Sequence, residues 1–107
     1  MRIQLLTYDG CPIAPAARER LRRVVESLGI VPAIEEIDTA APGTPDGLRD
    51  WGSPTILIDG VDIEGRETPT GAGCRLYRDA DGVVSGVPTE ATLRPPLLGD
   101  SKPSSSM

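Results

Sequence analysis

Cys11 is the residue whose type and position most favour chemistry in this 107-residue chain. It follows a short apolar stretch and precedes an amphipathic segment, so we expect it just before a helix. The first N–H groups of a helix lack intrahelical partners, and the aligned peptide dipoles place partial positive charge there. Both effects predict a Cys11 pKa below the value of about 8.5 for a free cysteine. Such a thiolate can act as a nucleophile, exchange disulfides or bind a soft metal, and the alternative is a small buried apolar side chain.

Cys74 is the second of the two cysteines, and histidine is absent, which excludes histidine bases, histidine triads and histidine metal ligands. Two cysteines are too few for a disulfide scaffold or a four-cysteine zinc site. Only the fold can bring Cys74 close enough to Cys11 for a bond, and the glycines before it give the backbone freedom to approach. The alternative is a buried structural thiol beside Leu76 and Tyr77.

The segment Ser53-Pro54-Thr55 is the second feature, because cis peptide bonds occur almost only before proline. A cis bond at Pro54 would turn the Ser53 backbone toward the start of the helix. The Ser53 N–H and C=O groups could then pair with an extended substrate such as a peptide or glutathione. The alternative is an ordinary trans proline that opens an edge strand.

The elements that must position these groups are short. Apolar and β-branched runs predict strands at residues 3–8, 34–38, 55–58 and 61–63, the last two joined by an Asp-Gly turn. Helical spacing predicts a helix over 12–28, with Pro12 at the first helical position. We expect one or two helical turns within 45–51. A last short helix begins after Thr89 as N-cap, and Pro95 and Pro96 are expected to limit its length.

This order predicts an α/β fold with a small mixed four-stranded sheet flanked by helices. A strand–helix–strand opening favours a parallel pair, and the hairpin adds antiparallel strands at one side. We expect one domain over residues 1–98 and a disordered tail over 99–107. The sequence does not decide whether residues 64–87 form a lid, a strand or a disordered insertion.

Several other side chains receive simple interpretations. The arginines of the first helix predict a solvated face, with an anchor for a glutathione carboxylate as the alternative; they are Arg18, Arg20, Arg22 and Arg23. Trp51 is interpreted as an apolar anchor, Tyr8 as a core residue that could otherwise line the Cys11 pocket, and Asp62 as a turn residue.

The net charge of −5 disfavours general binding of nucleic acid or anionic lipid. Apolar runs are too short to cross a bilayer, and the apolar stretch near the N-terminus lacks a small-residue cleavage site. We therefore expect a cytoplasmic protein with free thiols.

The order and separation of these motifs resemble the thioredoxin-like superfamily. Cys11-Pro12 is similar to the start of a glutaredoxin active site, and Ser53-Pro54-Thr55 matches the cis-proline position of that fold. The segments 52–60, 73–78 and 86–89 also resemble a set of small bacterial thioredoxin-like proteins, some of which are linked to alkylmercury lyase.

The resemblance implies a thiol–disulfide oxidoreductase with Cys11 as the nucleophile and Pro12, Ser53, Pro54 and Thr55 near the substrate. Ala14 stands where dithiol members carry their second cysteine. Two routes stay open: resolution by an outside thiol, with glutathione as a candidate co-substrate, or by Cys74. We expect a thiol or disulfide partner, from a protein or glutathione, and no resident metal or cofactor. The alternatives are a thiolate module that binds a soft metal or organomercurial, and a non-catalytic domain for protein interaction.

Overall fold

The computed structural model describes residues 2–8, 10–68, 71, 75–78 and 81–98. The elements, in chain order, are β1 (Arg2–Thr7), α1 (Ala14–Ser27), β2 (Ala33–Asp38), α2 (Asp46–Arg49), β3 (Thr55–Ile58), β4 (Val61–Asp62), β5 (Tyr77–Arg78), β6 (Val84–Ser85) and α3 (Glu90–Leu97). Cys74 and the predicted tail over 99–107 lie outside the described residues.

Four strands form a mixed sheet in the order β2-β1-β3-β4. β1 runs parallel to β2, with Thr7 opposite Asp38 at their ends. It runs antiparallel to β3, with Leu6 opposite Thr55, and β4 pairs antiparallel with β3. The predicted α/β class and mixed four-stranded sheet are confirmed. Within the region left open at 64–87, β5 and β6 form a separate two-stranded hairpin.

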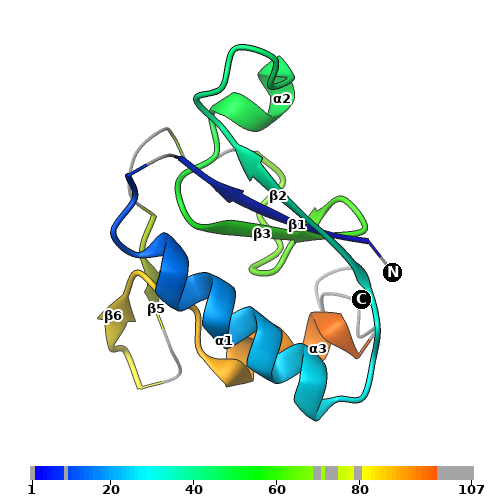
Figure 1. The fold of residues 1–107 in the computed structure, drawn as a ribbon. Coiled ribbons are helices and arrows are strands. Elements are labelled where there is room, and N and C mark those ends of the chain that lie inside the picture. Colours follow the sequence, from blue (N-terminus) through cyan, green and yellow to red (C-terminus); the bar gives the residue numbers. More distant parts are fainter. Residues whose placement is uncertain (1, 9, 69–70, 72–74, 79–80, 99–107) are drawn as a thin grey trace.

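The two longer helices, α1 and α3, pack against each other on one face of the sheet (Figure 1). The main core fills this layer with buried residues of both helices and the four-stranded sheet, together with Ile63 after β4 and Tyr77 of β5. The members from the helices and the sheet are Ile3, Leu5, Leu21, Val24, Val25, Ile56, Ile58, Leu93 and Leu97. Successive strand residues point to opposite faces, so Leu6 and Leu57 join a smaller cluster with Trp51. Trp51 is therefore the apolar anchor that the sequence predicts. Among the described residues, no helix combines the length and apolar character needed to cross a membrane.

The start of α1 differs from the prediction. The helix begins at Ala14, so Pro12 is not its first residue, and Pro15 takes the second helical position. The physical reason is the missing N–H of proline. A helix starting at residue 12 would put Pro15 where its N–H must bond within the helix, whereas a start at Ala14 puts it among the N–H groups that have no intrahelical partner.

The end of α3 also differs from the prediction. Thr89 is the N-cap as predicted, and its hydroxyl accepts a hydrogen bond from the Thr92 N–H at 3.2 Å. The helix nevertheless continues through Pro95 and Pro96 to Leu97. Leu97 is only 2% exposed and lies in the main core. Burying this side chain requires another helical turn, and its apolar burial offsets the hydrogen bonds that the prolines cannot make.

Candidate functional site

Cys11 lies in the turn that joins β1 to α1. Its backbone N–H donates to the Tyr8 carbonyl at 3.1 Å, which closes the turn, and Gly10 adopts a φ of 89° that favours glycine. The N-cap of α1 is Ile13, so Cys11 lies two residues before it. The predicted place of Cys11 just before a helix is confirmed. Pro12 occupies the N′ position, and Cys11 precedes it at N″.

The Ser53–Pro54 peptide bond is cis, so the ordinary trans proline is excluded. Ser53 Oγ donates a hydrogen bond to Cys11 Sγ at 3.0 Å. The sheet explains this contact, because antiparallel pairing puts the start of β3 beside the end of β1, where the Cys11 turn begins. The fold therefore joins the two features that the sequence singles out.

The surroundings of the Cys11 sulfur favour its thiolate. Burial acts to raise the pKa of Cys11, but hydrogen bonds lower it further than burial raises it. The donors are the Ser53 hydroxyl, the backbone N–H groups of Ile13 and Ala14, and the Tyr8 side chain. A depressed pKa increases the thiolate fraction at neutral pH, and the thiolate is the nucleophilic form.

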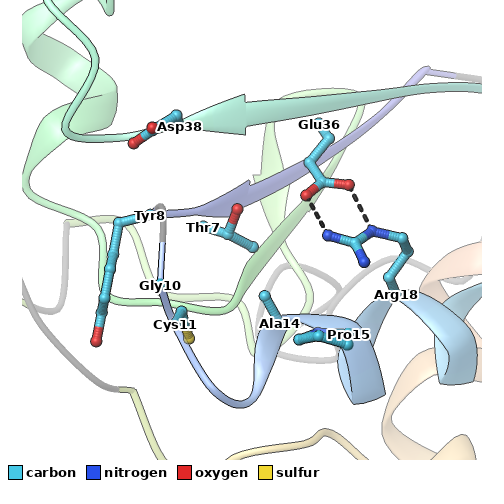
Figure 2. A pocket seen from close by; sticks show the side chains of 9 residues that line it. All are labelled: Thr7, Tyr8, Gly10, Cys11, Ala14, Pro15, Arg18, Glu36 and Asp38. Atoms are coloured by element: carbon cyan, nitrogen blue, oxygen red, sulfur yellow. Dashed lines mark hydrogen bonds and ion pairs between the residues drawn. The ribbon is translucent and has the colours of Figure 1, made fainter.

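A pocket of about 700 Å³ opens beside this sulfur between α1 and the ends of β1 and β2 (Figure 2). Its lining residues are Thr7, Tyr8, Gly10, Cys11, Ala14, Pro15, Arg18, Glu36 and Asp38. Cys11 is only 5% exposed. A reagent must therefore reach the sulfur through this pocket rather than across an open surface.

One arginine of the first helix belongs to the pocket. Arg18 Nε and Nη2 donate to the two carboxylate oxygens of Glu36 at 2.7 and 2.5 Å. Arg22 and Arg23 instead pair with Glu19 on the outer surface of α1, in agreement with the predicted solvated face. The alternative role, an anchor for a glutathione carboxylate, would require Arg18 to exchange or share its partner.

Tyr8 lines the pocket, so its interpretation as a core residue is wrong. It is half-buried, and Figure 2 shows its ring beside the turn that carries Cys11. β1 ends at Thr7, so Tyr8 lies outside the sheet and is directed by the turn instead. Pro12 is exposed next to this turn.

Thr55 follows the cis peptide, and its hydroxyl bonds to groups other than the Cys11 sulfur. Its hydroxyl donates to the Gly52 carbonyl at 2.6 Å and accepts from Arg75 Nη1 at 3.0 Å. Ser53, Pro54 and Thr55 are all buried. Of these three predicted site residues, Ser53 is the one whose side chain donates a hydrogen bond to the sulfur.

Sequence reasoning missed Arg75, whose side chain is only 2% exposed. Its guanidinium binds both oxygens of Asp62 at 2.6 and 2.9 Å and Glu64 Oε1 at 2.9 Å. Asp62 is therefore a buried ion-pair partner as well as the turn residue that the sequence predicts, because its carboxylate also accepts hydrogen bonds from the Glu64 and Arg66 N–H groups after β4. Burial acts to lower the pKa of Arg75, but the Asp62 carboxylate and the other nearby groups raise it. No local sequence spacing signals this pair, because it depends on where the chain returns after β4.

Arg75 and Tyr77 also hold the cis peptide in place through hydrogen bonds to the carbonyl groups of Ser53 and Pro54. The Arg75 backbone N–H donates to the Ser53 carbonyl at 2.8 Å, and the Tyr77 hydroxyl donates to the Pro54 carbonyl at 2.6 Å. The guanidinium carbon lies 4.6 Å from the centre of the Tyr77 ring. These contacts hold Ser53 in place, and Ser53 in turn contacts the Cys11 sulfur.

Within the described residues, Cys11 is the one thiol that could bind a soft metal. Those residues contain no group of three or more cysteine, aspartate or glutamate side chains arranged to hold a metal. Comparisons of the chain with protein-family models, with curated proteins and with solved structures found no match.

Proposed function

We propose that this protein is a thiol–disulfide oxidoreductase of thioredoxin-like fold, with the Cys11 thiolate as its nucleophile. The observation that carries the proposal is the 3.0 Å hydrogen bond from Ser53 Oγ to Cys11 Sγ, next to a cis-proline and at the open pocket. A hydroxyl aimed at sulfur, together with two backbone N–H groups, stabilises a thiolate where a substrate can enter.

The fold supports the same proposal. A parallel β1–β2 pair joined through α1, followed by the antiparallel β3–β4 hairpin and α3, has the order implied by the thioredoxin-like resemblance. Cys11 and the cis peptide occupy matching places within that order. A reducing, cytoplasmic compartment suits such a protein, because its thiol must be available as thiolate.

The proposed reaction has two steps. The Cys11 thiolate attacks one sulfur of a disulfide R–S–S–R, forms the mixed disulfide Cys11–S–S–R and releases R–S⁻. An outside thiolate R′–S⁻ then attacks the R sulfur of the mixed disulfide, which releases the Cys11 thiolate and forms R–S–S–R′. If Cys74 attacks instead, it bonds to the Cys11 sulfur and releases the second R–S⁻. The substrate disulfide is then fully reduced, and the Cys11–Cys74 disulfide that remains must be reduced by outside thiols.

The source of the second thiolate distinguishes two versions of the proposal. Ala14 removes the local dithiol route, so an outside thiol such as glutathione is the first candidate. Cys74 is the second candidate, because its neighbour in the sequence, Arg75, donates its N–H to the Ser53 carbonyl. Arg75, the residue that follows Cys74 in the sequence, is therefore anchored at the cis peptide.

The test is to treat the wild-type, Cys11→Ser, Cys74→Ser and double variants with bis(2-hydroxyethyl) disulfide and measure intact masses over time. We expect one mixed disulfide on Cys74→Ser and none on the folded double variant. If wild type loses its adduct by forming an internal disulfide while Cys74→Ser retains the adduct, Cys74 is the resolving thiol. If Cys11 of the folded Cys74→Ser variant does not react while the unfolded chain does, the proposed function is wrong.

A further inference from the structure

The Ser53 carbonyl already has a partner within the chain. The Arg75 N–H donates to it at 2.8 Å, and Arg75 is held by its own buried ion pairs with Asp62. An extended polypeptide substrate would need this carbonyl for its backbone. This carbonyl is therefore less available for the peptide pairing that the sequence suggests for Ser53, and reagents reach the sulfur through the pocket lined by Cys11.

The charges of that pocket are unbalanced. β2 places Glu36 and Asp38 on the same face, since residues two apart in a strand point the same way. Figure 2 shows both side chains on the β2 wall of the pocket, away from the Cys11 sulfur. Arg18 neutralises Glu36 through two hydrogen bonds. The Asp38 carboxylate accepts a hydrogen bond from the Ala40 N–H at 2.8 Å and forms no ion pair with a cationic side chain among the residues that the structure describes.

The Asp38 carboxylate thus leaves an excess of negative charge on the pocket wall, among the side chains that line it. The partial positive charge at the start of α1 faces the Cys11 thiolate and is matched by it. The chain as a whole also carries a net charge of −5, so the long-range field has the same sign. A ligand with a positive end is favoured here, and one with a carboxylate end is disfavoured.

We infer that the substrates of Cys11 are small disulfides with cationic ends, in preference to anionic ones such as glutathione disulfide and to extended polypeptides. This inference rests on the proposed function. The reaction is the thiol–disulfide exchange proposed above. The Cys11 thiolate displaces one half of the disulfide as a thiolate, and the other half stays bound to Cys11. Asp38 is the specificity-determining residue, since it holds the charge that no side chain within the described pocket lining offsets.

The test uses three disulfides that share a spacer of two methylene groups and carry a cationic, a neutral or an anionic end group: cystamine, bis(2-hydroxyethyl) disulfide and 3,3′-dithiodipropionate. Each rate with the Cys74→Ser protein is divided by its rate with N-acetylcysteinamide, which removes intrinsic differences between reagents. We expect the normalised rate for cystamine to exceed that for dithiodipropionate by about tenfold at low salt. Added salt should shrink the ratio, since it screens these charges.

The Asp38→Asn variant isolates the pocket charge, because asparagine keeps the oxygen that accepts from Ala40. We expect its cystamine preference to fall to about threefold or less. Asp46→Asn is the matched control, since it removes one charge from a fully exposed side chain on α2, and it should retain the preference. Equal normalised rates for all three disulfides, or an equal loss in both variants, would overturn the inference while leaving the proposed function intact. Failure of folded Cys11 to react with any of them would overturn both.

Discussion

The hydroxyl of Ser53 donates a hydrogen bond to the sulfur of Cys11 across 42 residues of sequence, with 3.0 Å between the two atoms. This contact connects the turn before α1 to the cis peptide before β3. Because Ser53 is itself held by the Arg75 backbone, three separate parts of the chain determine the environment of one thiol.

Removing the Ser53 hydroxyl should make Cys11 less reactive. In Ser53→Ala the thiolate loses a hydrogen bond, so the pKa of Cys11 should rise toward its ordinary value. A hydrogen bond to a charged group contributes enough free energy to lower the alkylation rate at neutral pH by about tenfold. The measurement is the rate of iodoacetamide labelling in a Cys74→Ser background.

Ser27→Ala, which removes a hydroxyl at the other end of α1, is the control and should react like its parent. An unchanged rate in Ser53→Ala would show that the hydroxyl does not stabilise the thiolate.

The buried ion pair should be essential for stability. Arg75→Met would leave the Asp62 carboxylate buried without its cationic partner, at a cost of about 3–5 kcal/mol in the free energy of unfolding. Replacing both residues, as in Arg75→Met with Asp62→Leu, should recover part of that loss, because the buried Asp62 charge is removed as well. Glu64, the other partner of Arg75, is partly exposed and still lies 3.5 Å from Arg66. Urea unfolding measures both. Arg94→Met breaks an exposed pair with Glu90 and should cost less than about 1 kcal/mol. A similar cost for the two arginine variants would contradict the assigned role of Arg75.

Tyr77 should make the fold sensitive to alkali. Burial raises the pKa of its phenol, and the neutral hydroxyl donates to the Pro54 carbonyl at 2.6 Å. A raised folded-state pKa means that the stabilisation is complete below the ordinary value of about 10 and is lost as pH rises through the folded-state pKa. Tyr77→Phe should cost about 1–2 kcal/mol at neutral pH and should lose less stability above about pH 10 than wild type does. Urea unfolding at several alkaline pH values decides this, and parallel decline of both proteins would refute it.

Local signals in the sequence predicted the elements well where one residue type decides the structure. Thr55–Ile58 forms β3 within the predicted bounds, and Thr89 caps α3 because its hydroxyl satisfies a free N–H at the helix start. Local rules failed where tertiary packing decides. Pro96 lies inside α3 because Leu97 must reach the core. The later start of α1 has instead a local cause, which is the missing N–H of Pro15.

The candidate site could be predicted from the sequence in part. Cys11 could be found because its place before a helix is visible in the sequence. Asp38 and Arg75 could not be found, because their roles depend on the β1–β2 register and on where the chain crosses behind the cis peptide. Such contacts join residues far apart in sequence, and composition and spacing carry no signal for them.

The pH dependence of Cys11 alkylation tests the central claim most directly. The Cys74→Ser variant leaves Cys11 as the single thiol, and its rate of reaction with iodoacetamide is followed from about pH 5 to about pH 10. The structure predicts a single titration whose midpoint lies below the ordinary thiol pKa, with reaction through the folded protein. A midpoint at or above that ordinary value, or labelling that occurs only when the protein unfolds, would contradict the assignment of Cys11 as an activated nucleophile.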